Sequence, residues 1–554
     1  MPLLIDLFGY LSIVLHGLTV TAQSTMLGGV LFLVFLARPL ATPLGLSGAG
    51  VLAGTARIAA WAAVALIVCE GLTIAMQVAV LMSTVELTLF QTLGAGFVLA
   101  GMVKIMVAAA IATALFTGGA RAAKGATPTS LLLALVVVEL AAATLSTHAA
   151  ARIDSRGVLL AVSGLHQFGA AIWIGGIPSF LFALAYVQDG RAWRAIGARF
   201  SRLSMVGVGC ILISGVTLSV AYVHDWQGFY GTAYGVMVGA KIAMFTALLL
   251  LGLGNYRLVA RLRRDPATPI NRLKRFAEVE IGVGIAIFFA AASLTSVPPS
   301  VDLTHDRVTL SEIVERNTPV LPRLVSPRHD DLALPALQTK LDAEAAAHRA
   351  APQMAFVPGS GDMPPRNAAD IAWSEYNHHW AGLFVLAIGF LALANQAGLR
   401  AARHWPLVFL GLGAFLFLRS DPEVWPLGEI GFLESFRDVE VLQHRVFVVL
   451  IVAFAFFEWR VRAGWANRSA ALVFPVVTFL GGLLLLTHSH AIANVKDQLL
   501  VELTHTPLAL AGIGAGAARW LELRLDPPGS RIAGWIWPVC FILVGVLLLL
   551  YREA

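Results

Sequence analysis

The sequence has few charged residues for its length. Only 13% of the 554 residues are Asp, Glu, Lys or Arg, against roughly 25% in soluble domains, and 58% are hydrophobic. This composition excludes an ordinary soluble domain and indicates an integral membrane protein surrounded by lipid. The net charge of +6 comes mostly from arginines in short connections between apolar runs, so it does not indicate a nucleic-acid-binding surface.

Cysteine and nucleotide-binding motifs are also scarce. The three cysteines, Cys69, Cys210 and Cys540, each lie in an apolar run and form no CxxC pair, which excludes a disulfide framework and a thiolate zinc site. The sequence contains no GxxxxGK[ST] loop. None of the connections rich in Lys and Arg is long enough to hold a nucleotide-binding domain. We therefore expect neither an ATPase nor another enzyme.

Apolar runs of about 20 residues, the length that crosses a bilayer as a helix, recur along the whole chain. We predict an all-α polytopic membrane protein with about 14 transmembrane helices, centred near residues 20, 66, 105, 138, 172, 213, 243, 287, 386, 412, 450, 480, 510 and 541. The N-terminal MPLLIDLFGY lacks a basic region, which favours a first transmembrane helix over a cleaved signal peptide.

Basic residues concentrate in the odd-numbered connections, which are therefore expected to be cytoplasmic. Both termini should then be extracytoplasmic. The segment 299–375, rich in Pro, Asp and Glu, should be an outer loop of mostly irregular structure, with a possible short helix near LDAEAAAHRA (341–350).

The first 300 residues contain an internal repeat. LHGLTVTAQSTMLGG (15–29) resembles LHQFGAAIWIGG (165–176), and the three following spans match in the same order. Because each copy has an even number of spans, the two copies should be parallel. We expect four domains. Residues 1–152 form four-helix repeat A and residues 153–300 form four-helix repeat B. Residues 301–375 form an extracytoplasmic loop, and residues 376–554 form a six-helix membrane domain.

The repeat pairs His16 with His166 and Lys104 with Lys241. A charge in the middle of a bilayer costs about 3 kcal/mol on insertion scales, so such lysines normally have a partner or mark a pathway. Either they form ion pairs that orient helices, or they line a hydrated path. Candidate partners are Glu70, Glu139, Glu278 and Glu280. Two histidines at equivalent positions suggest a ligand or proton-relay role.

All but one of the fourteen histidines lie on the expected outer side. Those of the last six spans gather at helix ends and are predicted to form an outer metal site: His378, His379, His444, His488, His490 and His505. Solvent-facing interfacial histidines are the alternative. Three carboxylates, Glu375, Glu440 and Glu502, lie three or four residues before a histidine, where an acid can fix the imidazole tautomer. Imidazole with thioether, here Met76, suits copper, and histidine also suits zinc, iron and haem.

Specific motifs in repeat B resemble the copper resistance protein D (CopD/PcoD) family. They are LHQFGAAIWIGGIPSF (165–180), GTAYGVMVGAKIAMFTALLLLGLGNYRLV (231–259) and the closing LTSVPPS, and they contain His166, Trp173, Gly175, Gly176, Lys241 and Asn255. The resemblance implies a protein of the bacterial inner (plasma) membrane that handles copper, usually thought to pass it inward from the periplasm. It also implies a separate periplasmic CopC-like carrier as partner, because the chain has no strand-rich domain of its own.

We therefore expect a copper transporter, in which outer histidines capture the ion and His16 and His166 pass it into the bundle. The expected path includes Lys104, Lys241, Glu70, Met76 and Trp173. Two alternatives remain. One is a b-type cytochrome with haem b held by His16 and His166, or by His444 and His505, although the inner side has only His404 for a second haem. The other is a membrane copper chaperone for an oxidase.

Overall fold

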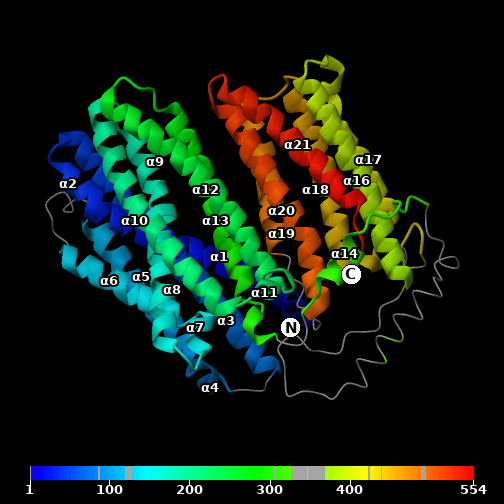
Figure 1. Cartoon of the computed structure of the whole chain (residues 1–554), viewed down its shortest axis with the longest axis horizontal. Coiled ribbons are helices and arrows are strands. Elements are labelled where there is room, and N and C mark those ends of the chain that lie inside the picture. Colours follow the sequence, from blue (N-terminus) through cyan, green and yellow to red (C-terminus); the bar gives the residue numbers. More distant parts are fainter. Residues whose placement is uncertain are drawn as a thin grey trace. The chain divides into compact units, whose positions relative to one another are not determined.

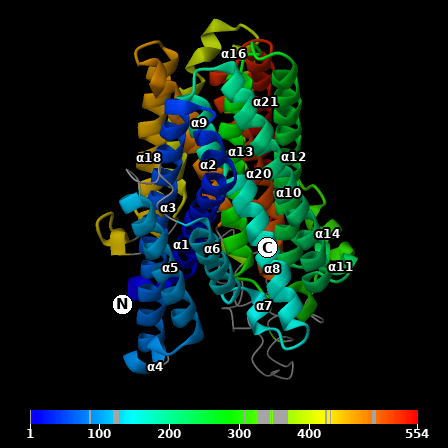
Figure 2. The ribbon, with the colours of Figure 1, turned by 90° about the vertical axis from the view of Figure 1, so that its left-hand side faces the viewer.

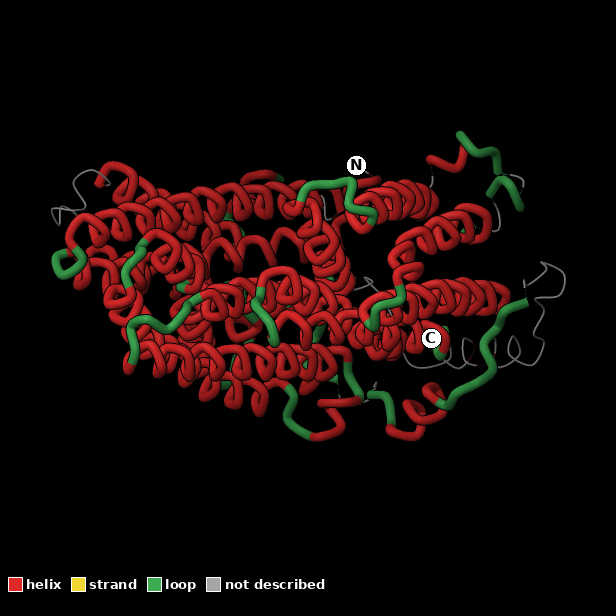
Figure 3. The backbone as a smooth tube through the Cα atoms, turned by 90° about the horizontal axis from the view of Figure 1, so that it is seen from above, coloured by secondary structure: helices red, strands yellow, loops and turns green. Residues whose placement is uncertain are grey.

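A computed structural model describes residues 2–84, 88–118, 128–303, 307–325, 343, 346, 368–421, 424–428, 430–437, 439–487 and 495–553. Throughout this part the chain is helical (Figures 1 and 3), and the only bridge of β type joins Val424 and Ile430.

Thirteen segments of the described chain are long and apolar enough to cross a membrane. A shorter apolar helix, α6 (Thr129–Thr144), stands where the fourth span was expected. Together they correspond to the fourteen expected spans. The predicted fold class, an all-α multi-pass membrane protein, is confirmed.

The chain divides into two compact units. Unit 1 comprises Met1–Phe229 and Met237–Thr304, and unit 2 comprises Tyr230–Val236 and His305–Ala554. Each unit is described by itself.

In the first half of unit 1, long helices pack against one another (Figure 2). Its elements are α1 (Pro2–Phe32), the π-helical η1 (Leu33–Ala37), α2 (Arg38–Ala41), α3 (Gly45–Thr84), α4 (Leu89–Leu93), α5 (Gly96–Gly118) and α6. Helix α3 packs between α1 and α5, and α6 packs on α5. Apolar side chains cover these helices on nearly all sides, as expected of helices that face both lipid and protein.

The second half of unit 1 begins with the short α7 (His148–Ala151). It continues with α8 (Arg156–Ala170), the π-helical η3 (Ala171–Gly175), α9 (Ile177–Tyr186), α10 (Gly190–Tyr222), α11 (Trp226–Tyr230), α12 (Ala233–Arg264) and α13 (Asn271–Leu294). Helix α10 packs on α8, and α13 packs on both α1 and α9. The repeat remains a prediction, in which α1 and the α8–η3–α9 segment are equivalent first spans.

These two first spans cross with their backbones in close approach. A Cβ atom on Gly175 would lie 1.9 Å from the Ser24 carbonyl oxygen, and one on Gly28 would lie 2.2 Å from the Gly175 carbonyl carbon. Small residues allow such contacts between membrane helices. Beside the crossing, Gln23 Nε2 donates a hydrogen bond to Gln167 Oε1 at 3.2 Å. Glycine is therefore required here because no side chain fits.

Unit 2 contains the last six spans. Its elements are α14 (Leu310–Asn317), α16 (Ala368–Gln396), η5 (Arg400–Leu407), α17 (Val408–Arg419), η6 (Glu434–Arg437), α18 (Val439–Arg462), η7 (Arg468–Leu472), α19 (Val473–Leu486), α20 (Val495–Arg524) and α21 (Gly529–Leu549). Helix α21 packs on α16 and α20, and α19 packs on α20. The core holds Trp405, Phe474 and Trp537, with the Arg462 guanidinium 5.2 Å from the Trp405 ring centroid.

The expected outer loop has some regular structure at its edges. Helix α14 begins at a capping box formed by Thr309 and Glu312, and α16 begins at Ala368, earlier than the expected start of the six-helix domain. Apart from residues 343 and 346, the LDAEAAAHRA segment (341–350) lies outside the described residues.

Candidate functional site

A buried ion pair lies in the first half of unit 1. Lys104 Nζ on α5 and Glu70 Oε2 on α3 are 2.7 Å apart, with the two side chains 4% and 9% exposed. Glu139 on α6 is fully buried, and neither of its carboxyl oxygens has a hydrogen-bond partner among the described residues. It lies within electrostatic range of Lys104. Helices α3, α5 and α6 thus each contribute one ionisable group.

His16 on α1 joins these groups. It interacts electrostatically with Lys104, and no described residue forms a hydrogen bond with its ring. We call His16, Glu70, Lys104 and Glu139 layer A. Met76 is buried on α3 about 9 Å of helical rise beyond Glu70.

The corresponding layer B, formed by His166, Ser214 and Lys241, differs in its hydrogen bonding. His166 Nδ1 on α8 lies 2.9 Å from Ser214 Oγ on α10, and that hydroxyl donates its single proton to the Cys210 carbonyl at 2.5 Å. The hydroxyl therefore accepts from His166 Nδ1–H, which leaves the imidazole lone pair on Nε2. No described residue occupies Nε2, so this nitrogen can accept a hydrogen bond or bind a metal.

Lys241 on α12 interacts electrostatically with His166. No described residue forms an ion pair or hydrogen bond with its amine, in contrast to Lys104. The predicted repeat would account for the difference. It aligns EGLT (70–73) with SGVT (214–217), which puts Ser214 where repeat A has Glu70. Sequence reasoning missed Ser214 as a site residue, although this alignment contained the signal.

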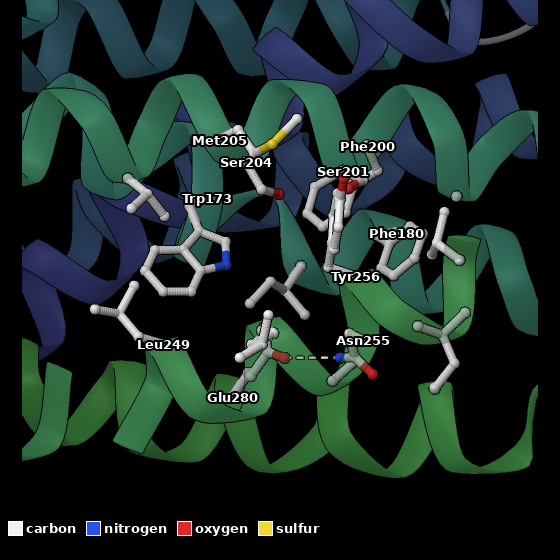
Figure 4. Close-up of a pocket in the computed structure, with 18 residues that line it drawn as sticks. Trp173, Phe180, Phe200, Ser201, Ser204, Met205, Leu249, Asn255, Tyr256 and Glu280 are labelled. Carbon is white, nitrogen blue, oxygen red and sulfur yellow. Dashed lines mark hydrogen bonds between the residues drawn. The ribbon is translucent and has the colours of Figure 1, made fainter. Parts of the chain in front are cut away.

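Trp173 lies in η3, further along the same span as His166, and borders a cavity of about 340 Å³. Figure 4 shows it opposite Glu280 and Asn255, with Asn255 Nδ2 donating to Glu280 Oε1 at 2.7 Å. The indole also interacts with this carboxyl group. His166 and Trp173 therefore lie on one span. Glu280, a candidate partner of the lysines, instead accepts a hydrogen bond from Asn255.

In unit 2, backbone groups occupy both ring nitrogens of His379. Its Nδ1 accepts from the Arg323 backbone N–H at 2.7 Å, and its Nε2 lies 2.9 Å from the Tyr551 carbonyl, to which it donates. The side chain is 2% exposed. In this arrangement His379 joins the segment before α16 to the end of α21, and no nitrogen is left for a metal.

His378 and His505 both contact the ring of Tyr551. The His378 ring stacks on it with centroids 3.8 Å apart, and the His505 ring meets it edge-on at 6.2 Å. Each Nδ1–H donates to a carbonyl one turn earlier, Ser374 at 2.8 Å and Val501 at 3.0 Å. The hydrogen bond to the Ser374 carbonyl places the lone pair of the His378 imidazole on Nε2.

The expected carboxylate–histidine pairs are arranged differently. His444 Nδ1 lies 2.6 Å from Asp421 Oδ1, a partner from a separate segment. Glu375 accepts from Arg323 Nε at 3.4 Å, and Glu502 accepts from Thr506 Oγ1 at 3.1 Å. The Glu440 side chain is outside the described part of the structure.

His488 and His490 lie outside the described residues. Within the residues that are described, no three His, Cys, Asp or Glu side chains converge as a metal site. The prediction of His379 as a metal ligand is corrected, because backbone groups occupy both of its ring nitrogens. For the other five histidines the outer metal site stays a prediction.

Comparisons with known proteins bear on layer B. Residues 194–294 match the family model described as copper resistance protein D. This region includes most of α10 and all of α12 and α13, and it holds Ser214, Lys241, Asn255 and Glu280.

The chain is also 30% identical over 156 residues to "Copper transport protein CutJ" of Bacillus subtilis (strain 168). The alignment covers 27% of this chain and 28% of that protein, so the chain spans little more than a quarter of the relative's length. No solved structure was found to match. These matches confirm the resemblance to the copper resistance protein D family seen in the sequence, over residues 194–294 in the second half of unit 1.

Proposed function

We propose that the chain transports copper ions across the bacterial inner membrane and has no enzymatic activity. The family match over α10, α12 and α13 supports copper as the cargo. The observation that carries the proposal is the state of His166, whose Nδ1–H is held by Ser214 while Nε2 keeps its lone pair inside the membrane-spanning part of unit 1. Such an oriented imidazole is a suitable copper ligand.

His16 and His166 act in this proposal as successive binding positions. Gln23 lies about 10 Å of helical rise after His16 on α1, and Gln23 contacts Gln167, the neighbour of His166. His16 therefore lies about 10 Å of helical rise before the contact between the two spans. A copper ion would move from one imidazole to the next, past Met76 and towards Trp173.

The lysines set the charge along this path. Glu70 neutralises Lys104, so layer A can accept a cation without strong repulsion. Lys241 has no carboxylate partner among the described residues and acts on His166. Its positive charge weakens copper binding there, and an ion must be bound weakly enough to leave if it is to be conducted.

Unit 2 would collect copper on the outer side. His378, with its tautomer fixed by the Ser374 carbonyl, is its best-prepared ligand in the described structure. A separate CopC-like carrier could deliver copper to it. In this orientation both termini are extracytoplasmic.

Metal and cofactor content tests the proposal. We expect the purified protein to bind copper, measured by mass spectrometry, and to show no haem absorption. Copper content should fall in a His16→Ala/His166→Ala variant and stay unchanged in His404→Gln. A Soret band with one iron per chain would overturn the proposal in favour of the b-type cytochrome.

A further inference from the structure

The cavity in the second half of unit 1 ends at a buried acid. It lies among η3, α9, α10, α12 and α13, and extends from Trp173 to Gly197, Val259 and Leu273. The last three residues lie near the α9–α10 and α12–α13 connections. Gly190 begins α10, and Pro266 lies between α12 and α13. A Cβ on Gly190 would lie 2.2 Å from the Pro266 carbonyl oxygen, so the two connections touch. They therefore lie on the same side of the bundle, which is expected to be cytoplasmic.

Glu280 is the acid at the deep end of this cavity. It is 4% exposed and lies about 14 Å of helical rise into α13. Its partners are neutral: Asn255 donates to it, and Trp173 interacts with it. No described Lys, Arg or His forms an ion pair with it. Glu70, in contrast, forms an ion pair with Lys104.

The groups that face Glu280 from the packed elements are nearly all uncharged. Besides Glu280, the only titratable side chain that lines the cavity is Tyr256 on α12. On α1, which packs against α13, the nearest ionisable group is His16. Its neighbour Gly17 lies against Phe289, about two and a half turns from Glu280. A carboxylate in such surroundings is costly to keep ionised, so its charge depends on proton uptake.

Polar atoms in the cavity lack partners. Asn255 Oδ1 and Ser204 Oγ are buried and have no hydrogen-bond partner among the described residues. Figure 4 shows both residues beside the cavity, with Ser201 and Tyr256 on the way to its far end. A cavity of this size with several polar groups has room for water molecules, which would satisfy these atoms and lead to Glu280.

We propose that Glu280 binds and releases a proton through this cavity, on the side of the α9–α10 and α12–α13 connections, and that this exchange accompanies copper passage. The carboxylate takes up one proton to become a neutral carboxyl and returns it to the same side. The coupling to copper rests on the proposed transport function, whereas the proton site itself does not.

Access of water to the cavity can be measured without copper. In full-length protein whose three native cysteines are replaced, Ser204→Cys should react with a membrane-impermeant thiol reagent added from the connection side. Val206→Cys is the matched control, because Val206 is 57% exposed on α10 outside the cavity lining and should face lipid. If Ser204→Cys reacts no faster than Val206→Cys, the cavity is filled by lipid or closed, and the proposed route is wrong.

Infrared difference spectra between acidic and alkaline pH test the acid directly. We expect a neutral carboxyl band that disappears in Glu280→Gln. Glu278→Gln serves as control on the same helix, because Glu278 is paired with Arg275 and should contribute an ionised carboxylate instead. An unchanged carboxyl band in Glu280→Gln would overturn the proposal.

Coupling is measured in proteoliposomes that contain a pH-sensitive dye. Copper addition should move protons in the wild type, and this movement should fall at least several-fold in Glu280→Gln. Equal proton movement in both would disprove the coupling. If copper does not move in either protein, the transport function fails, while the thiol and infrared results still decide whether Glu280 is a proton site.

Discussion

Lys104 and Glu70 form a buried ion pair of 2.7 Å in unit 1, and Lys241, the lysine that the repeat aligns with Lys104, has no such partner in the described structure. In the predicted repeat Ser214 stands at the position of Glu70, and in the structure it holds His166. If the repeat is correct, the two halves of unit 1 use equivalent positions differently. Layer A contains an ion pair, whereas layer B contains a histidine oriented by a hydroxyl group.

Loss of the carboxylate in Glu70→Gln should destabilise the protein by about 3–5 kcal/mol, because it leaves a buried ammonium without its partner. The measurement is unfolding of the purified protein in detergent. Glu70→Gln combined with Lys104→Met should recover most of the stability, since both charges are then gone.

An exposed pair provides the control for this experiment. Arg152 and Asp302 are 2.8 Å apart, with side chains 27% and 46% exposed, so Asp302→Asn should cost at most about 1 kcal/mol. A Glu70→Gln protein as stable as Asp302→Asn would show that Lys104 does not depend on Glu70.

Ser214→Ala should lower copper affinity about 10- to 100-fold, because the hydroxyl no longer fixes the His166 tautomer. Competition with a copper chelator measures this affinity in the purified protein. Thr217→Ala is the control, since Thr217 lies on the same helix and donates to the Ile213 carbonyl without contacting a histidine. Unchanged affinity in Ser214→Ala would mean that His166 is not a copper ligand.

The adjacent histidines of α16 should give opposite results. His379→Ala should lower stability by about 1–3 kcal/mol, because it leaves the Arg323 N–H and the Tyr551 carbonyl unpaired, and it should not change copper content. His378→Ala should reduce copper content with a smaller effect on stability. Copper loss in His379→Ala alone would contradict the assignment of His379 as a structural residue.

His148, outside the membrane-spanning segments, predicts a pH effect on stability. Burial lowers the pKa of its imidazole below the ordinary value of 6.5, with a further contribution from Arg152. The unfolded chain therefore takes up a proton more readily than the folded one, and the folded state loses stability as pH falls below about 6.5. Unfolding of wild type and His148→Gln, compared at about pH 8 and about pH 5.5, should show a smaller loss in the variant. An equal loss in both would assign the effect to other groups.

Composition and apolar run length were enough to predict the fold, because each span must pair its own backbone groups within the membrane. The motif at residues 231–259 also indicated the resemblance to the copper resistance protein D family. The hydrogen-bond partners could not be predicted in the same way. Local spacing suggested Glu375 for His379, whereas the structure places backbone groups of Arg323 and Tyr551 there. Such partners come from distant segments, and only packing brings them together.

Copper uptake by proteoliposomes tests the central claim most directly. The wild type should take up copper, His166→Ala should lose most of this uptake, and His404→Gln, which changes a histidine on the basic side outside both layers, should keep it. Undiminished uptake in His166→Ala, or no uptake by well-folded wild-type protein, would contradict the account.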